Sequence, residues 1–139
     1  MRAYKLDFGW EMDFPRKWIQ EADDNGVYIF YPPNDSATVY ATVFTANSQG
    51  IPAPEEVLEE FFVKSLAEKN AEEIPFSVDS LGCRAFFCVD DNEIFRISVG
   101  VFTEGNLLSL NVYAESEDMV YKVSELFGSV RFNGGYDVV

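Results

Sequence analysis

Residues 84–114 read RAFFCVDDNEIFRISVGVFTEGNLLSLNVYA, and the expected fold class rests first on this segment. Apolar and polar residues alternate within 93–102 and 107–114, with the period of two that is typical of β-strands, and 84–89 is a short run rich in apolar residues that also predicts a strand. Asp90-Asp91-Asn92 and Glu104-Gly105-Asn106 separate the three runs, and both are turn-forming sequences. Three consecutive strands joined by short turns predict an antiparallel meander.

Further strand-like sequence lies upstream of the meander. Asp23-Asp24-Asn25-Gly26 tolerates the positive φ of a tight turn, so the runs on either side of it are expected to pair as a hairpin. Phe14-Pro15-Arg16-Lys17-Trp18 is expected to break the chain before that hairpin. We predict further strands at 4–8, 18–22, 27–31, 37–44 and 78–81, and an antiparallel sheet of about six strands.

Two segments have the patterns of helices. The first begins at Pro54, continues with Glu55 and Glu56, which complement the positive end of the helix dipole, and extends to about Lys69. The second begins after Ser116, a good N-cap residue. Its apolar stripe is expected to pack on the sheet and consists of Met119, Val123, Leu126, Phe127 and Val130. The fold class is therefore α+β.

Composition indicates one folded domain spanning residues 1–139. The chain has 47% hydrophobic and 16% aromatic residues, and no linker or repeat divides it. It contains no histidine, which excludes Ser-His-Asp and Cys-His nucleophile systems and histidine-ligated zinc or haem. No catalytic residue, metal ligand set or cofactor motif is identified, so we expect a protein that binds rather than an enzyme.

Acidic residues dominate the charge. Ten Lys and Arg residues against 24 Asp and Glu residues give a formal net charge of −14. This charge disfavours nucleic acid and anionic membranes as partners. Two explanations stay open: the acidity only keeps the protein in solution, or it attracts a basic protein partner or mimics a polyanion. The sequence specifies no oligomeric state.

Cys83 and Cys88 are five residues apart within one strand-like run, which directs their side chains to opposite faces. They are expected to be reduced thiols, as in a cytoplasmic protein. The N-terminus has no apolar signal region, and no apolar run is long enough to span a membrane. We therefore predict a cytoplasmic location.

Two acidic segments, Asp23-Asp24-Asn25-Gly26 and Asp90-Asp91-Asn92-Glu93, offer clustered oxygen atoms that a cation could use. Neither has the spacing of an EF-hand loop. Ordinary turn chemistry and a weak cation site are the two explanations for both segments.

Several short segments together resemble the PsbP-like superfamily. The resemblance is carried by Phe14-Pro15 and Trp18, the hairpin through Gly26, the run Tyr40-Ala41-Thr42-Val43, the Pro54-led helix, and Lys122-Val123 with Leu126-Phe127-Gly128-Ser129-Val130-Arg131-Phe132. It implies an antiparallel sheet with helices in an α/β/α arrangement. The superfamily contains the extrinsic photosystem II subunit, a Ran-binding nuclear transport factor and bacterial proteins, and its members are mainly binding proteins. The histidine-linked metal sites of the plant subunit have no counterpart here.

Polar and aromatic side chains recur on one side of the predicted strands. Thr38 and Ser109 belong to this set, and the candidate binding residues within it are Tyr40, Thr42, Arg96, Ser98, Asn111 and Tyr113. Tyrosine and arginine are residue types that anchor protein interfaces. A solvated outer sheet face, with Arg96 in a cross-strand ion pair, explains the same pattern.

These observations lead to two functional hypotheses. The first is a non-catalytic acidic binding domain that recognises a basic protein partner, for example a bacterial immunity or adaptor protein. The alternative is a small-molecule or cation-binding domain that uses the polar face of the sheet.

Overall fold

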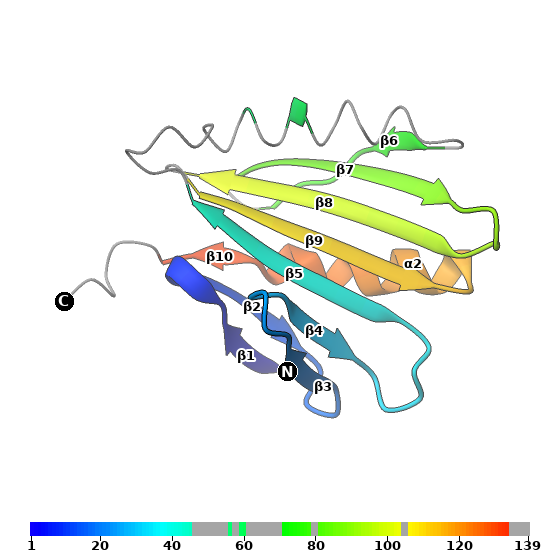
Figure 1. The fold of residues 1–139 in the computed structure, drawn as a ribbon, viewed down its shortest axis with the longest axis horizontal. Helices are drawn as coiled ribbons and strands as arrows, with labels where there is room; N and C mark the ends of the chain where they lie inside the picture. Colours follow the sequence, from blue (N-terminus) through cyan, green and yellow to red (C-terminus); the bar gives the residue numbers. More distant parts are fainter. Residues whose placement is uncertain (46–55, 57–58, 61–70, 79–80, 104–105, 134–139) are drawn as a thin grey trace.

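The structure is a computed structural model that describes residues 1–45, 56, 59–60, 71–78, 81–103 and 106–133. This part of the chain forms a mixed α+β fold with ten β-strands and one α-helix (Figure 1). Seven strands make one antiparallel sheet in the order β3-β4-β5-β9-β8-β7-β6. Their bounds are β3 (Ile19–Ala22), β4 (Tyr28–Tyr31), β5 (Thr38–Thr45), β6 (Glu72–Ile74), β7 (Gly82–Val89), β8 (Phe95–Thr103) and β9 (Asn106–Ala114).

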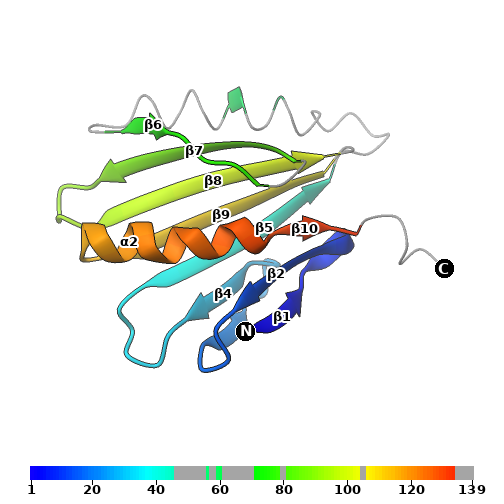
Figure 2. The same ribbon diagram turned by 180° about the vertical axis from the view of Figure 1, so that it is seen from behind.

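The other three strands form a small antiparallel sheet in the order β1-β2-β10, with β1 at Arg2–Lys5, β2 at Trp10–Phe14 and β10 at Arg131–Phe132. The helix α2 spans Glu117–Ser124, and the 3₁₀ turns η1 and η2 span Asp7–Gly9 and Glu125–Ser129. Figure 2 shows α2, η2 and the small sheet on the same side of the large sheet.

The predicted meander is present as β7, β8 and β9, the centre of the large sheet. Ala85, Val99 and Leu110 lie opposite one another in this register, and Ala41 of β5 continues the row. All four are fully buried. The row faces α2 and the small sheet, and it forms the centre of the hydrophobic core.

The small sheet is joined to the large one by stacked aromatic side chains. Trp10, Met12 and Phe14 of β2 are fully buried, and the ring of Phe14 stacks on Phe30 of β4 with centroids 4.1 Å apart. Tyr4 of β1 meets Phe30 edge to face at 5.1 Å. These contacts bury the apolar side of β2 against the large sheet.

The second helix begins as predicted, with the Ser116 hydroxyl accepting a hydrogen bond from the Met119 N–H at 3.3 Å. Its α-helical part ends at Ser124, and η2 then carries Phe127 into the core. The Ser129 hydroxyl donates to the Leu126 carbonyl at 2.7 Å, which closes this tight turn before β10. No helix in the described residues is long and apolar enough to cross a membrane.

The predicted count of about six strands is corrected by the structure, which has ten strands in the described residues. Strand β2 lies just before the expected chain break, where we predicted no strand, although Trp10, Met12 and Phe14 alternate with two acidic residues. The predicted strand 4–8 ends at Lys5, because residues 7–9 form η1 with Phe8 at a φ of 60°. Strand β6 is a three-residue edge strand with two glutamates, which are depleted in strands.

One further predicted strand differs in the structure, and one predicted helix lies mostly outside the described residues. Val78 and Leu81 form an isolated β-bridge in place of the predicted strand 78–81. The predicted helix 54–69 lies mostly outside the described residues, and of its positions Glu56, Glu59 and Glu60 are described as helical.

The two cysteines are not joined by a disulfide bond, and they lie on opposite faces of β7. Cys83 pairs in register with Val101 on the core side, whereas Cys88 pairs with Arg96 on the other side. The Cys83 thiol donates to the Phe76 carbonyl at 3.2 Å, and burial raises the pKa of this thiol.

Candidate functional site

The candidate binding residues lie on the face of the large sheet that points away from α2. In the register of β5, β9 and β8, Thr38, Tyr113 and Arg96 form one cross-strand row. Tyr40, Asn111 and Ser98 form the next row, and Thr42 pairs with Ser109 in the row after it. We call this set the polar sheet face: Thr38, Tyr40, Thr42, Arg96, Ser98, Ser109, Asn111 and Tyr113.

Two tyrosines dominate the open part of this face. Tyr40 is 38% exposed, and its ring meets the ring of Tyr113 edge to face, with centroids 5.7 Å apart. The two residues are diagonal neighbours on adjacent strands, where long side chains can reach one another. An amphipathic aromatic pair of this kind can bury ring surface under a partner and still hydrogen-bond through its hydroxyls.

Ser98 and Asn111 satisfy each other within the sheet. The Ser98 hydroxyl is buried and donates to the Asn111 Oδ1 atom at 2.5 Å. This hydrogen bond gives the buried Ser98 hydroxyl a partner within the sheet and holds Asn111, the cross-strand neighbour of Tyr40, in place. The surface that a ligand can reach is therefore centred on the tyrosines.

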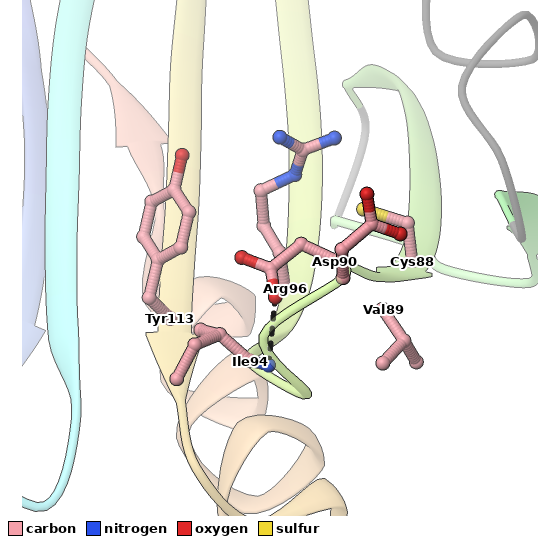
Figure 3. A pocket seen from close by; sticks show the side chains of 7 residues that line it. Cys88, Val89, Asp90, Ile94, Arg96 and Tyr113 are labelled. Carbon is pink, nitrogen blue, oxygen red and sulfur yellow. Dashed lines mark hydrogen bonds between the residues drawn. The ribbon is translucent and has the colours of Figure 1, made fainter.

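Three hollows adjoin one another around Tyr113, which lines all of them. The first has a volume of about 230 Å³ and lies between Tyr113 and the β7–β8 hairpin (Figure 3). The second, about 240 Å³, shares Ile94 with the first, and the third, about 340 Å³, shares Thr38 with the second. We call these three hollows the Tyr113 groove; it is lined by Asp35, Ser36, Ala37, Thr38, Tyr40, Cys88, Val89, Asp90, Asp91, Ile94, Arg96, Tyr113, Ala114 and Glu115.

Figure 3 shows the side chains of Arg96 and Tyr113 extending in the same direction from neighbouring strands. Asp90 lies beside them in the hairpin that leads into β8. The groove lining thus combines an arginine, a phenol and a carboxylate within its first hollow.

The charge of the groove is predominantly acidic. Four exposed carboxylates line it, those of Asp35, Asp90, Asp91 and Glu115, against the guanidinium of Arg96. At the same face, beyond the groove, Arg84 of β7 is paired with Glu59 at 3.0 Å and with Glu73 at 3.1 Å. The groove is therefore a negatively charged hollow with aromatic walls.

The two acidic turns use their first aspartate in the same way. The Asp90 Oδ1 atom accepts hydrogen bonds from the N–H groups of Asn92 and Ile94, at 2.8 and 2.9 Å. The Asp23 Oδ1 atom likewise accepts from Asn25 and Val27, at 2.8 and 3.0 Å. Among the described residues, no group of three or more Cys, Asp or Glu side chains could hold a metal ion. Turn chemistry accounts for both segments.

Sequence patterns alone missed the rim of the groove. Asp35 and Glu115 lie outside the alternating runs, and they line the groove because the β5–β9 register brings the start of β5 beside the end of β9. The cross-strand pair of Thr38 and Tyr113 is the signal that could have identified Asp35 and Glu115, because each of them lies within three residues of one member of that pair.

Comparisons with known proteins identify the fold. No protein-family model matches the sequence, and a search of curated proteins finds no match. Cyanobacterial PsbP (CyanoP) from Synechocystis sp. PCC 6803, in its solution structure, is similar with a TM-score of 0.61 and 17% identity, covering 94% of this chain and 91% of that chain.

A crystal structure of a protein from Bacteroides thetaiotaomicron is similar with a TM-score of 0.68 and 14% identity. The match covers 96% of this chain and 48% of that chain, so this chain spans about half of its length. At these identities the likeness concerns the fold alone. The chain has a PsbP-like fold.

Proposed function

We propose that this chain is a non-catalytic acidic binding domain that recognises a basic protein partner through the Tyr113 groove. The observation that carries the proposal is the groove itself, which is lined by four exposed carboxylates and by the Tyr40–Tyr113 pair. A bacterial immunity or adaptor protein, acting in the cytoplasm on such a partner, is the form of function that we favour.

The two features of the groove have separate roles in this proposal. The net charge of −14 raises the rate at which a basic partner is encountered, because attraction between opposite charges acts over a Debye length. Tyr40 and Tyr113 slow dissociation, because buried aromatic side chains are the residue types that anchor interfaces.

Site-specific photocrosslinking tests the proposal. A benzophenone amino acid replaces Tyr40 on the groove side or Tyr121 on α2, which are matched in exposure at 38% and 39%. We expect crosslinks in the native host to a basic protein from position 40 and none to that protein from position 121. Equal crosslinking from both positions, or crosslinks only to acidic proteins, would contradict the proposal.

A small-molecule ligand in the first hollow is the second candidate function. That hollow of about 230 Å³ contains Arg96 together with Asp90 and Asp91, which suits a small molecule that carries both an anionic and a cationic group. Mass spectrometry of the protein, purified from its host under native conditions, distinguishes the two functions: a bound small molecule that is lost in Arg96→Met favours this candidate.

A further inference from the structure

A separate hollow lies on the other side of the fold, where α2 and η2 meet the β2–β3 and β4–β5 connections. Its volume is about 530 Å³, and Ser36 is its one lining residue in common with the Tyr113 groove. We call it the seam pocket; it is lined by Met1, Pro15, Trp18, Pro32, Ser36, Met119, Lys122, Val123, Glu125 and Leu126.

The walls of the seam pocket are apolar and continuous with the core. Trp18, Met119 and Leu126 are half-buried and pack against the core cluster, and Val123 is buried within it. A concave, largely apolar hollow of several hundred cubic ångströms has the size and lining of a small-molecule site. The seam pocket meets both criteria.

The turns that form one side of the pocket are fixed by their own hydrogen bonds. The Trp18 N–H donates to the Pro15 carbonyl, and the Asp35 N–H donates to the Pro32 carbonyl, each at 3.0 Å. The Trp18 ring also packs on Phe14, with centroids 5.2 Å apart. A wall held in this way is formed before a ligand arrives, which reduces the entropy lost on binding.

Lys122 of α2 and Glu125 of η2 bring one basic and one acidic side chain to the edge of this apolar hollow. Lys122 of α2 is exposed and forms no ion pair with any described residue. Lys122 lies in the last turn of α2, where its positive charge interacts favourably with the negative end of the helix dipole. This interaction accounts for a lysine at this position but not for the apolar hollow next to it. Lys122 is the one basic side chain among the lining residues, so it is the group there that can pair with an anion.

From these observations we infer that the seam pocket binds a small amphipathic anion, with an apolar body between Trp18, Met119 and Leu126 and a carboxylate or similar group at Lys122. The inference does not depend on the function proposed for the Tyr113 groove. A ligand of this class would bury its hydrocarbon part against the core and leave its charged end in water beside the ammonium group.

Titration with decanoate tests the inference, with decanol and decyltrimethylammonium as probes of the same chain length. Calorimetry gives the affinities, and Trp18 fluorescence reports the site, because Trp10 is fully buried against Phe132 and does not line the pocket. We expect saturable binding of decanoate to one site per chain, more tightly than decyltrimethylammonium, with a change in Trp18 emission.

Two variants locate the site. Lys122→Gln should weaken decanoate binding by about threefold to fivefold, the size of an exposed charge pair, and leave decanol binding unchanged. Lys5→Gln, an exposed lysine on β1 outside the pocket, should change neither. Met119→Ala should weaken decanoate and decanol alike, with circular dichroism confirming that the variant is folded.

Several results would overturn the inference. These are no decanoate binding at millimolar concentration, tighter binding of decyltrimethylammonium, or the same affinity in Lys122→Gln and the unmodified protein. Concentration-dependent dimerisation that Met119→Ala abolishes would assign the pocket to a second copy of the chain instead. A failed crosslinking result at Tyr40 would leave the decanoate result unaffected, so the two proposals fail separately.

Discussion

Tyr40 and Tyr113 meet edge to face across β5 and β9, with ring centroids 5.7 Å apart and ring planes at 85°. Both rings lie on the side of the sheet away from the core, so their contact supports a surface rather than the packed interior. An aromatic pair adds about 0.5–1.5 kcal/mol beyond its buried area.

Truncating this pair should therefore leave the fold intact. We expect Tyr40→Ala to lower the free energy of unfolding by about 1 kcal/mol or less, as measured by urea denaturation. A loss several times larger would show that Tyr40 belongs to the core, and binding data from that variant would then have no clear interpretation.

Truncating a buried residue of the C-terminal segment should, in contrast, lower the free energy of unfolding strongly. Phe127 is fully buried against the core, so Phe127→Ala should create a cavity and cost about 3–5 kcal/mol in unfolding free energy. Leu126→Ala, at the half-buried neighbouring position, is the comparison and should cost less. Equal losses in the two variants would contradict the assignment of Phe127 to the core.

Arg131 joins the C-terminal strand to β2. Its Nε and Nη2 atoms donate to Glu11, and Nη2 also donates to Asp13 at 3.0 Å. These contacts, led by the hydrogen bond to Asp13, raise the pKa of the guanidinium further above its ordinary value. Removing Arg131 would therefore leave two neighbouring carboxylates without their shared cation.

We expect Arg131→Gln to lower the unfolding free energy by about 1 kcal/mol, since the side chain is 38% exposed and solvent weakens its ion pairs. Thermal melts measure the loss, with Arg16→Gln as the control because Arg16 is exposed and pairs with no described residue. Equal melting temperatures for the two variants would contradict a structural role for Arg131.

Tyr28 links β4 of the large sheet to η1, which lies between β1 and β2, because its hydroxyl donates to the Asp7 carboxylate at 2.7 Å. Burial, followed by this hydrogen bond and the negative charge of Asp7, raises the pKa of Tyr28 from 10.0 to about 12. The neutral phenol is therefore favoured in the folded state, and this contribution to stability is present below about pH 10 and is lost as the pH rises through about 12.

Ultraviolet absorbance of the phenolate measures this titration. We expect Tyr28→Phe to remove a late titration step near pH 12, and Asp7→Asn to move that step to lower pH. An unchanged titration curve in Tyr28→Phe would show that the link is absent in solution.

The meander was predictable from sequence because three physical signals agree in residues 84–114. Alternation assigns the faces, short polar turns separate the strands, and the hairpin aspartate satisfies the N–H groups of its own turn. The same signals predicted the hairpin through Gly26, whose φ of 82° suits glycine.

The small sheet was harder to predict because its pairings join distant parts of the chain. Arg131 pairs with Glu11 and Phe132 with Trp10, and no local pattern specifies such a pairing. The two-residue strand β10 is too short to show an alternation. Pro15, which follows Phe14, predicts a break in the chain, and the alternation of buried residues in 10–14 is too short to outweigh that signal.

The candidate site was predictable only in part. Alternation correctly placed Tyr40, Arg96 and Tyr113 on one face, because the period of a strand fixes the direction of each side chain. The hollows and their acidic rim depend on connections such as residues 32–37, whose approach to Tyr113 follows from the folded register.

The proposed binding of a basic protein at the Tyr113 groove is tested most directly by the binding kinetics of the partner identified by crosslinking. Association and dissociation rates are measured between about 50 and 500 mM salt for the unmodified protein, Tyr113→Ala and the control Tyr121→Ala. We predict an association rate that falls steeply with salt and a dissociation rate that rises at least about tenfold in Tyr113→Ala, a loss of about 1.4 kcal/mol, and not in Tyr121→Ala. Salt-independent association, or equal dissociation rates for Tyr113→Ala and the unmodified protein, would contradict the proposal.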